Sequence, residues 1–112
     1  MPGGRPGANP PDPFEAIAHP LRRRLLDQLA AGEQAAGALA APHDVSRPAI
    51  SQHLHILREA GLVSERRVGR ARLYRLEPAG LRTVHDWLAS YERFWQGKLG
   101  ALQEYLKEQH GP

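Results

Sequence analysis

The polar side chains of residues 45–63, VSRPAISQHLHILREAGLV, have types and a spacing that suit hydrogen bonding to a nucleic acid. Ser46 is a typical helix N-cap and Pro48 suits a first helical turn. Gly61 suits a C-terminal stop, so the sequence predicts a helix over 46–60. One side of this helix is apolar, and the other consists of Arg47, Pro48, Ser51, Gln52, His55, Arg58 and Glu59. Because a helix fits the major groove and these groups can read base edges, the polar side predicts contact with double-stranded DNA.

A basic hairpin is predicted directly after this helix. Residues 62–68 and 71–77 each alternate apolar and polar side chains, and the VGRA sequence between them holds the glycine that a hairpin tip needs. The ribbon over 62–76 carries Arg66, Arg67, Arg70, Arg72 and Arg75. Guanidinium groups pair with phosphates, so we expect the ribbon to contact the DNA backbone. A polar helix side alone is typical of a solvated surface, and this neighbouring ribbon is what favours DNA.

Positive charge is concentrated in the same part of the chain. The formal net charge of the 112 residues is +3, and residues 44–76 contain seven arginines against three acidic residues. From residue 81 onward, four basic residues balance four acidic ones. A local excess of this kind indicates a surface that meets a polyanion.

The other elements are expected to hold this helix and ribbon in place. Residues 1–13, rich in proline and glycine, predict a disordered arm. A short helix over 14–18, a longer one over 20–32 and a third over 33–40 precede the helix described above, and a helical stretch over 81–109 ends the chain. The apolar stripe of the longer helix consists of Leu21, Leu25, Leu26 and Leu29. The predicted fold class is mainly α with a small β-hairpin.

This order of parts resembles a known family. The segments AIAHPLRRRLLDQLAAGE and GALAAPHDVSRPAISQHLHILREAGLVSERRVGRARLYRLEP look like the winged helix-turn-helix of ArsR-type bacterial repressors, over about residues 14–78. The resemblance implies a winged helix-turn-helix domain over 14–80, a dimerisation helix over 81–110, and a homodimeric repressor bound to a partly palindromic operator. The DNA-contacting residues that it implies are Arg47, Pro48, Ser51, Gln52, His55 and Arg58 on the helix and Arg66, Arg67, Arg70 and Arg72 on the wing.

Four further polar residues have an expected environment. His53 lies on the apolar side of the helix over 46–60, and we expect it to be packed and hydrogen-bonded. For Arg22, Arg23 and Arg24 two alternatives stay open, since these side chains either reach backbone phosphates or remain solvated.

The chain lacks ligands that the metal sensors of this family use. It has no cysteine, and EQAAGALAA offers no thiol, imidazole or carboxylate after Glu33, so a soft-metal site there is excluded. The terminal stretch has no His pair at a spacing of three or four among His85, Asp86, Glu92, Glu104 and His110. The sequence therefore predicts no metal site and no cofactor, and the resemblance is to a metal-site-free subgroup.

Aromatic residues are concentrated in the terminal stretch, where five of the seven Phe, Trp and Tyr residues lie between Trp87 and Tyr105. Its apolar residues recur every three or four positions and predict a dimerisation interface. They are Leu81, Val84, Leu88, Tyr91, Trp95, Leu99, Leu102 and Leu106. Packing within one subunit is the alternative. Gly97 and Gly100 predict either a kink or a close approach of two backbones.

Other classes of protein fit the sequence less well. No apolar run approaches the roughly 20 residues of a membrane span, so we expect a cytoplasmic protein. The two His-Asp dipeptides have no phosphate loop, nucleophile motif or paired acid beside them, so the sequence does not predict an enzyme. Three functions stay open: a dimeric DNA-binding repressor, which the residues favour, a sensor gated by a small molecule or metal at the terminal-helix seam, and a protein-interaction module.

Overall fold

The computed structural model describes residues 11–110, apart from the side chains of Leu99 and His110. The arm predicted over 1–13 thus falls mostly outside the described residues. The helices and strands are α1 (Pro13–Ile17), α2 (Pro20–Ala30), β1 (Gln34–Ala35), α3 (Ala36–Ala40), α4 (Arg47–Glu59), β2 (Val63–Val68), β3 (Ala71–Leu76), the 3-10 helix η1 (Pro78–Leu81), α5 (Arg82–Ala89) and α6 (Glu92–His110). The predicted fold class, mainly α with a small antiparallel sheet, is confirmed.

The chain divides into two compact units at Arg82 and Thr83. In the first unit the leucine-rich sides of α2, α3 and α4 form one core. The stripe predicted for α2 is buried, since none of its four leucines is more than 8% exposed. The fully buried large side chains of the other elements are Leu39, Ile50, Leu54, Leu57 and Leu62. This core holds α4 by its apolar side only.

The ends of α4 follow from local chemistry. The hydroxyl of Ser46 accepts a hydrogen bond from the backbone N–H of Ala49 at 3.2 Å, which satisfies one of the unpaired donors of the first turn. Pro48 lies in that turn, where its missing N–H costs nothing. Gly61 has a φ of +80°, a left-handed conformation that disfavours other residues and stops the helix. The predicted helix is confirmed.

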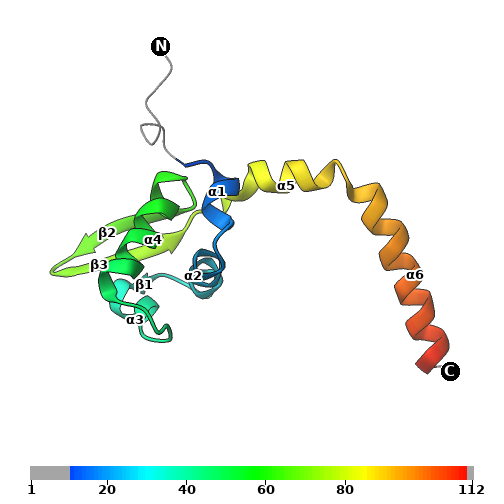
Figure 1. The fold of residues 1–112 in the computed structure, drawn as a ribbon, viewed down its shortest axis with the longest axis horizontal. Helices are drawn as coiled ribbons and strands as arrows, with labels where there is room; N and C mark the ends of the chain where they lie inside the picture. Colours follow the sequence, from blue (N-terminus) through cyan, green and yellow to red (C-terminus); the bar gives the residue numbers. More distant parts are fainter. Residues whose placement is uncertain (1–10, 111–112) are drawn as a thin grey trace, which may run out of the picture. The chain divides into compact units, whose positions relative to one another are not determined.

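The hairpin is also confirmed, and Figure 1 shows it as a ribbon that projects past α4. Strands β2 and β3 pair antiparallel from Val63 opposite Leu76 to Val68 opposite Ala71. The two-residue loop between them has Gly69 at a φ of +60°, whereas Arg70 has no positive φ. A glycine at the first loop position is typical of a type II′ turn, whose twist matches that of the two strands.

The helix predicted over 33–40 is partly wrong. Gln34 and Ala35 form β1, which pairs with Tyr74 and Leu73 of β3 and makes a third strand, so the order in the sheet is β1-β3-β2. The helix α3 begins only at Ala36. Alanine favours a helix locally, but the open edge of β3 offers backbone hydrogen bonds to this segment, and the tertiary pairing overrides the weak local preference.

The second unit contains most of α5 together with α6, and its predicted single helix is interrupted. The break lies at Ser90 and Tyr91, where the N–H of Ser90 bonds to the carbonyl of Trp87 at 3.2 Å. The hydroxyl of Ser90 donates to the same carbonyl at 2.6 Å, and such side-chain bonds compete with the helical backbone ladder. Gly97 and Gly100 lie inside α6, which continues through both.

Candidate nucleic-acid interface

The outer side of α4 carries the residues that the sequence assigned to base recognition. Arg47, Pro48, Ser51, Gln52, His55, Arg58 and Glu59 are all exposed. The apolar residues of the same helix are buried or half-buried, with Ile50, Leu54 and Leu57 fully enclosed. The complete separation of the two sides, which helical periodicity predicted, is therefore confirmed, and the polar side lies open to a partner.

A groove lies between α4 and the ribbon, and we call it the helix–wing groove. Its wider part has a volume of about 350 Å³. The lining residues are Ala35, Ala36, Gly37, Arg47, Ser51, Arg70, Ala71, Arg72 and Tyr74. Three guanidinium groups from α4 and the ribbon tip thus converge on one depression with no carboxylate in its lining. This concentration of positive charge suits an anionic, phosphate-bearing partner.

The narrower part of the groove, of about 60 Å³, contains a carboxylate. Glu65 of β2 accepts a hydrogen bond from the hydroxyl of Tyr74 at 2.8 Å and lies 3.5 Å from the guanidinium of Arg58 on α4. Burial raises the pKa of the Tyr74 phenol, and the hydrogen bond to Glu65 raises it further. A polar bridge therefore connects the C-terminal half of α4 to the ribbon.

The five ribbon arginines fall into two groups. Arg66 forms two hydrogen bonds to Glu33, at 2.8 and 2.7 Å, and this bonding lowers the pKa of the Glu33 carboxyl. Arg75 bonds to Glu77 at 3.2 Å; the pKa of Glu77 is lowered mainly by a hydrogen bond from Ser64, with Arg75 second. Ion pairs as exposed as these contribute little to stability, so a phosphate could displace either one.

The second group consists of Arg67, Arg70 and Arg72, and none of these forms an ion pair with a described carboxylate. The side chains of Arg67 and Arg70 form no hydrogen bond or ion pair with any residue between 11 and 110, whereas the Arg72 guanidinium interacts with the Tyr74 hydroxyl and acts to lower the pKa of that phenol. The sequence could not separate these arginines from Arg66 and Arg75, since all five have the same side chain and lie on the same hairpin. Glu33 and Glu77, the partners of Arg66 and Arg75, lie outside the two strands.

Two of the three consecutive arginines of α2 hold α1 in place. Arg22 donates to the carbonyl of Ala16 at 2.7 Å and to that of Glu15 at 3.3 Å, and Arg23 donates to the carbonyl of Ile17 at 2.7 Å. The carbonyls of Ala16 and Ile17 belong to the last turn of a helix, where intrahelical donors run out, whereas that of Glu15 also accepts from the N–H of Ala18 at 3.2 Å. Sequence analysis missed this role of the two side chains.

His53 was expected to be packed and hydrogen-bonded, and this is confirmed. Its Nδ1 lies 3.2 Å from Nη1 of Arg22, and its ring lies 4.6 Å from that of His19, centroid to centroid. Burial lowers the pKa of His53, and the neighbouring His19 and Arg22 lower it further. The residue belongs to the support of α4 rather than to its outer side.

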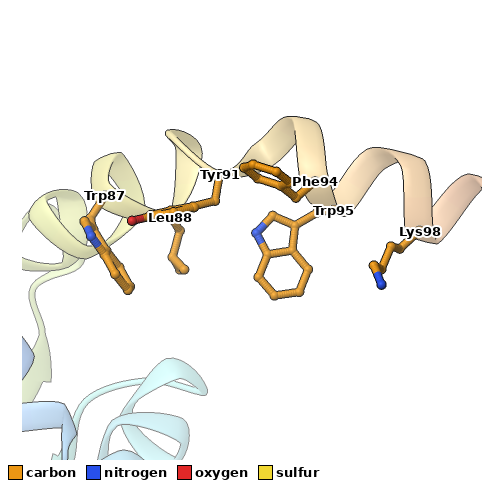
Figure 2. Close-up of a pocket in the computed structure, with 6 residues that line it drawn as sticks. All are labelled: Trp87, Leu88, Tyr91, Phe94, Trp95 and Lys98. Carbon is orange, nitrogen blue, oxygen red and sulfur yellow. The ribbon is translucent and has the colours of Figure 1, made fainter.

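Aromatic side chains of α5 and α6 line a second depression, with a volume of about 490 Å³ (Figure 2). Its lining consists of Trp87, Leu88, Tyr91, Phe94, Trp95 and Lys98. The rings of Trp87 and Tyr91 meet edge to face at 5.4 Å between centroids. Of the predicted dimerisation residues, Leu81 and Val84 are half-buried, whereas Leu88, Tyr91, Trp95, Leu102 and Leu106 are between 43% and 54% exposed. The side chain of Leu99 lies outside the described residues.

Within 11–110, no three His, Cys, Asp or Glu side chains are grouped as ligands of a metal ion. None of the described helices has the length and apolar character needed to span a bilayer.

Comparison with known proteins places the chain in a family. A family described as a helix-turn-helix domain matches residues 17–66, from α1 to β2. The chain is 42% identical over 98 residues to the HTH-type transcriptional regulator Rv2034 of Mycobacterium tuberculosis, a match that covers 88% of this chain and 89% of the relative. It is 37% identical over 78 residues to the transcriptional repressor SdpR of Bacillus subtilis, covering 70% of this chain and 87% of that repressor.

Solved structures agree with these sequence matches. A possible transcriptional regulator for arsenical resistance has a TM-score of 0.66 and 47% identity, over 84% of this chain and 95% of the other. The ArsR family transcriptional regulator RHA00566 has a TM-score of 0.67 and 32% identity, over 74% and 91%. On its sequence, its fold and the basic groove beside its helix-turn-helix, the chain is a member of the ArsR family of winged helix-turn-helix transcriptional regulators.

Proposed function

We propose that the protein is a homodimeric repressor that binds a partly palindromic DNA operator through α4 and the wing, which is the ribbon formed by β2 and β3. The observation that carries this proposal is the helix–wing groove, where Arg47, Arg70 and Arg72 converge beside the exposed side of α4. A relative and a solved homologue are named as a repressor and as a regulator, which supports the same function. Because such a repressor acts on chromosomal DNA, its place is the cytoplasm.

In this proposal the polar residues of α4 contact bases, whereas the arginines of the groove contact phosphates. The α4 residues Pro48, Ser51, Gln52 and His55 are exposed and lie on the side that would enter a major groove. Ser51 and Gln52 carry the hydrogen-bonding groups that distinguish base edges. Arg47, Arg58 and the wing arginines Arg66, Arg67, Arg70 and Arg72 would neutralise phosphates, the term that sets affinity and its dependence on salt.

We propose that a second copy of the chain packs against the exposed apolar side chains of α5 and α6. Eight large apolar side chains of this unit are more than 40% exposed, including both tryptophans, which is more contiguous apolar surface than a soluble monomer usually shows. Aromatic residues are enriched in the buried centres of protein interfaces. A dimer with two α4 helices matches a two-fold DNA site.

Selection of DNA fragments from a random pool by the purified protein tests this function. We expect enriched sequences with two inverted half-sites about one helical turn apart, and binding to the promoter region upstream of the chain's own gene, which would make the repressor autoregulatory. Binding without any sequence preference would contradict the proposal and favour a protein-interaction module.

A sensor gated by a small molecule is a second candidate, and the aromatic depression of Figure 2 favours it. The absence of thiols and of a described metal-ligand cluster points away from metal as its effector. An effector must bind one state of the dimer better than the other in order to shift DNA binding. Calorimetry with apolar candidate ligands, with and without operator, tests this, and equal affinity in both states rejects the candidate.

A further inference from the structure

The geometry points to Glu65 as a positioning residue that fixes the wing relative to α4 through the junction of Glu65, Tyr74 and Arg58. This inference rests on the proposed function, since positioning matters only if α4 and the wing engage one DNA duplex together. Glu65 lies on β2 opposite Tyr74 of β3, and its side chain is only 17% exposed. Its carboxylate is placed between the ribbon and α4, where both elements contact it.

The contacts of Glu65 join three elements. The phenol of Tyr74 donates to the carboxylate at 2.8 Å, and Tyr74 itself is 4% exposed and part of the core. Nη1 of Arg58, near the C-terminal end of α4, lies 3.5 Å from the other carboxylate oxygen. Nη2 of Arg58 lies 3.4 Å from Nδ1 of His55, one turn earlier on the same helix. The wing is thus connected to the DNA-facing side of α4 through one carboxylate.

The negative charge of Glu65 argues against a direct contact between this residue and DNA. It lines the same groove as Arg72 and Ser51, next to the part where guanidinium groups gather. A carboxylate there repels phosphates, so its removal should strengthen DNA binding if charge alone mattered. A positioning role predicts the opposite for the specific site, because a wing that is free to move no longer places its arginines on the phosphates while α4 reads the bases.

Glu65→Gln separates these two effects. We expect roughly five- to tenfold weaker binding to the selected operator, the consequence of losing a charge-assisted hydrogen bond at the junction, and equal or tighter binding to an unrelated duplex of the same length. The magnitude of the salt slope on the operator should fall by about 0.9 for each phosphate contact that is lost. Asp27→Asn is the charge-matched control, since Asp27 is exposed on α2 and does not line the helix–wing groove. It should leave operator binding unchanged or slightly tighter.

Tyr74→Phe provides a second variant without a change of charge. Phenylalanine keeps the buried ring but removes the hydroxyl that donates to Glu65, so operator affinity should again fall several-fold with a smaller salt slope. Titration to the stoichiometric point corrects for any unfolded fraction. If Glu65→Gln binds the operator as tightly as Asp27→Asn does, or if affinity falls at an unchanged salt slope, the positioning role is rejected.

A measurement without DNA distinguishes this inference from the proposed function. The chain contains no cysteine, so spin labels can be attached uniquely at Glu59→Cys on α4 and Val68→Cys on the exposed ribbon tip, with labelled chains diluted in unlabelled protein. A broader distance distribution in Glu65→Gln and Tyr74→Phe than in the parent supports the positioning role even if no operator is found. Unchanged distributions overturn it, whereas loss of DNA preference in the parent protein overturns only the proposed function.

Discussion

The guanidinium of Arg22 on α2 lies 3.2 Å from Nδ1 of His53, on the inner side of α4. A guanidinium has no acceptor, so Nδ1 of His53 must be unprotonated and accept this hydrogen bond. The same Arg22 side chain donates to two carbonyls at the end of α1. One side chain therefore connects α1, α2 and α4, and this support depends on a neutral imidazole.

Stability should fall in mild acid because of His53. Burial and the neighbours His19 and Arg22 lower its pKa in the folded state below the ordinary value of 6.5. As the pH falls below 6.5, the unfolded chain binds a proton that the folded chain does not, so the free energy of unfolding decreases until the pH reaches the folded pKa. Thermal unfolding at pH 7.5 and 5.5 measures this loss. His53→Asn keeps a hydrogen-bond acceptor but does not titrate, so it should lose less stability between pH 7.5 and 5.5. An equal loss in both proteins would show that His53 is not the group responsible.

Arg70→Ala should reduce the salt dependence of operator binding. Arg70 lines the groove and has no hydrogen bond or ion pair within the described residues, so it is available to a phosphate. Loss of one contact in each subunit lowers the magnitude of the salt slope by roughly 2 per dimer. Arg75→Ala is the matched control, since Arg75 already bonds to Glu77, and its slope should change less. An electrophoretic mobility shift assay across a range of salt concentrations measures the slope. Equal slopes in the parent protein and in Arg70→Ala would show that Arg70 does not contact a phosphate.

Ser51→Ala and Gln52→Ala should alter base preference rather than salt dependence. Both side chains are exposed on α4, and neither carries a charge that would release counterions. Each lost base contact should cost about 1–3 kcal/mol at one or two operator positions and little elsewhere. Affinities for single-base variants of the operator provide the measurement. A uniform loss over all positions would indicate a general structural effect instead.

Trp95→Glu should convert the dimer to a monomer. Trp95 is 54% exposed in the isolated chain, and a carboxylate in its place would be buried without a partner at the proposed interface. Operator affinity should then fall by roughly 100-fold or more, because the second half-site contact is no longer intramolecular. Sedimentation equilibrium reports the mass. Gln96→Glu introduces the same charge at the next, exposed position of α6, about 100° around the helix from Trp95, and should stay dimeric.

Gly80→Ala should destabilise the first unit. A Cβ at Gly80 would overlap with the carbonyl oxygen of Gly61, at the point where η1 meets the end of α4. Backbone cannot yield as a flexible side chain does, so we expect a loss of about 1–3 kcal/mol in the free energy of unfolding. Urea titration measures it, with Ala79→Ser at the exposed neighbouring position as the control. A Gly80→Ala protein of parental stability would show that this contact is looser in solution.

The sequence by itself determined the parts that depend on local signals. The ends of α4 follow from the Ser46 cap and Gly61, its two sides follow from helical periodicity, and the hairpin tip follows from Gly69. The packed, hydrogen-bonded environment of His53 could also be predicted, because a polar ring on an apolar helix side must find a partner. For α4 and the hairpin tip the physical cause lies within a few residues along the chain.

The tertiary structure alone decided the rest, because the interacting groups are distant in the sequence. Gln34 and Ala35 became a strand only because the edge of β3 lies beside them. Arg66 and Arg67 are adjacent residues of the same type, and only the fold brings Glu33, from 33 positions earlier, to Arg66. The contact of Glu65 with α4 likewise requires the ribbon to fold back onto the helix. Periodicity specifies which side of an element a residue occupies, whereas the partner on that side is set by how the elements pack.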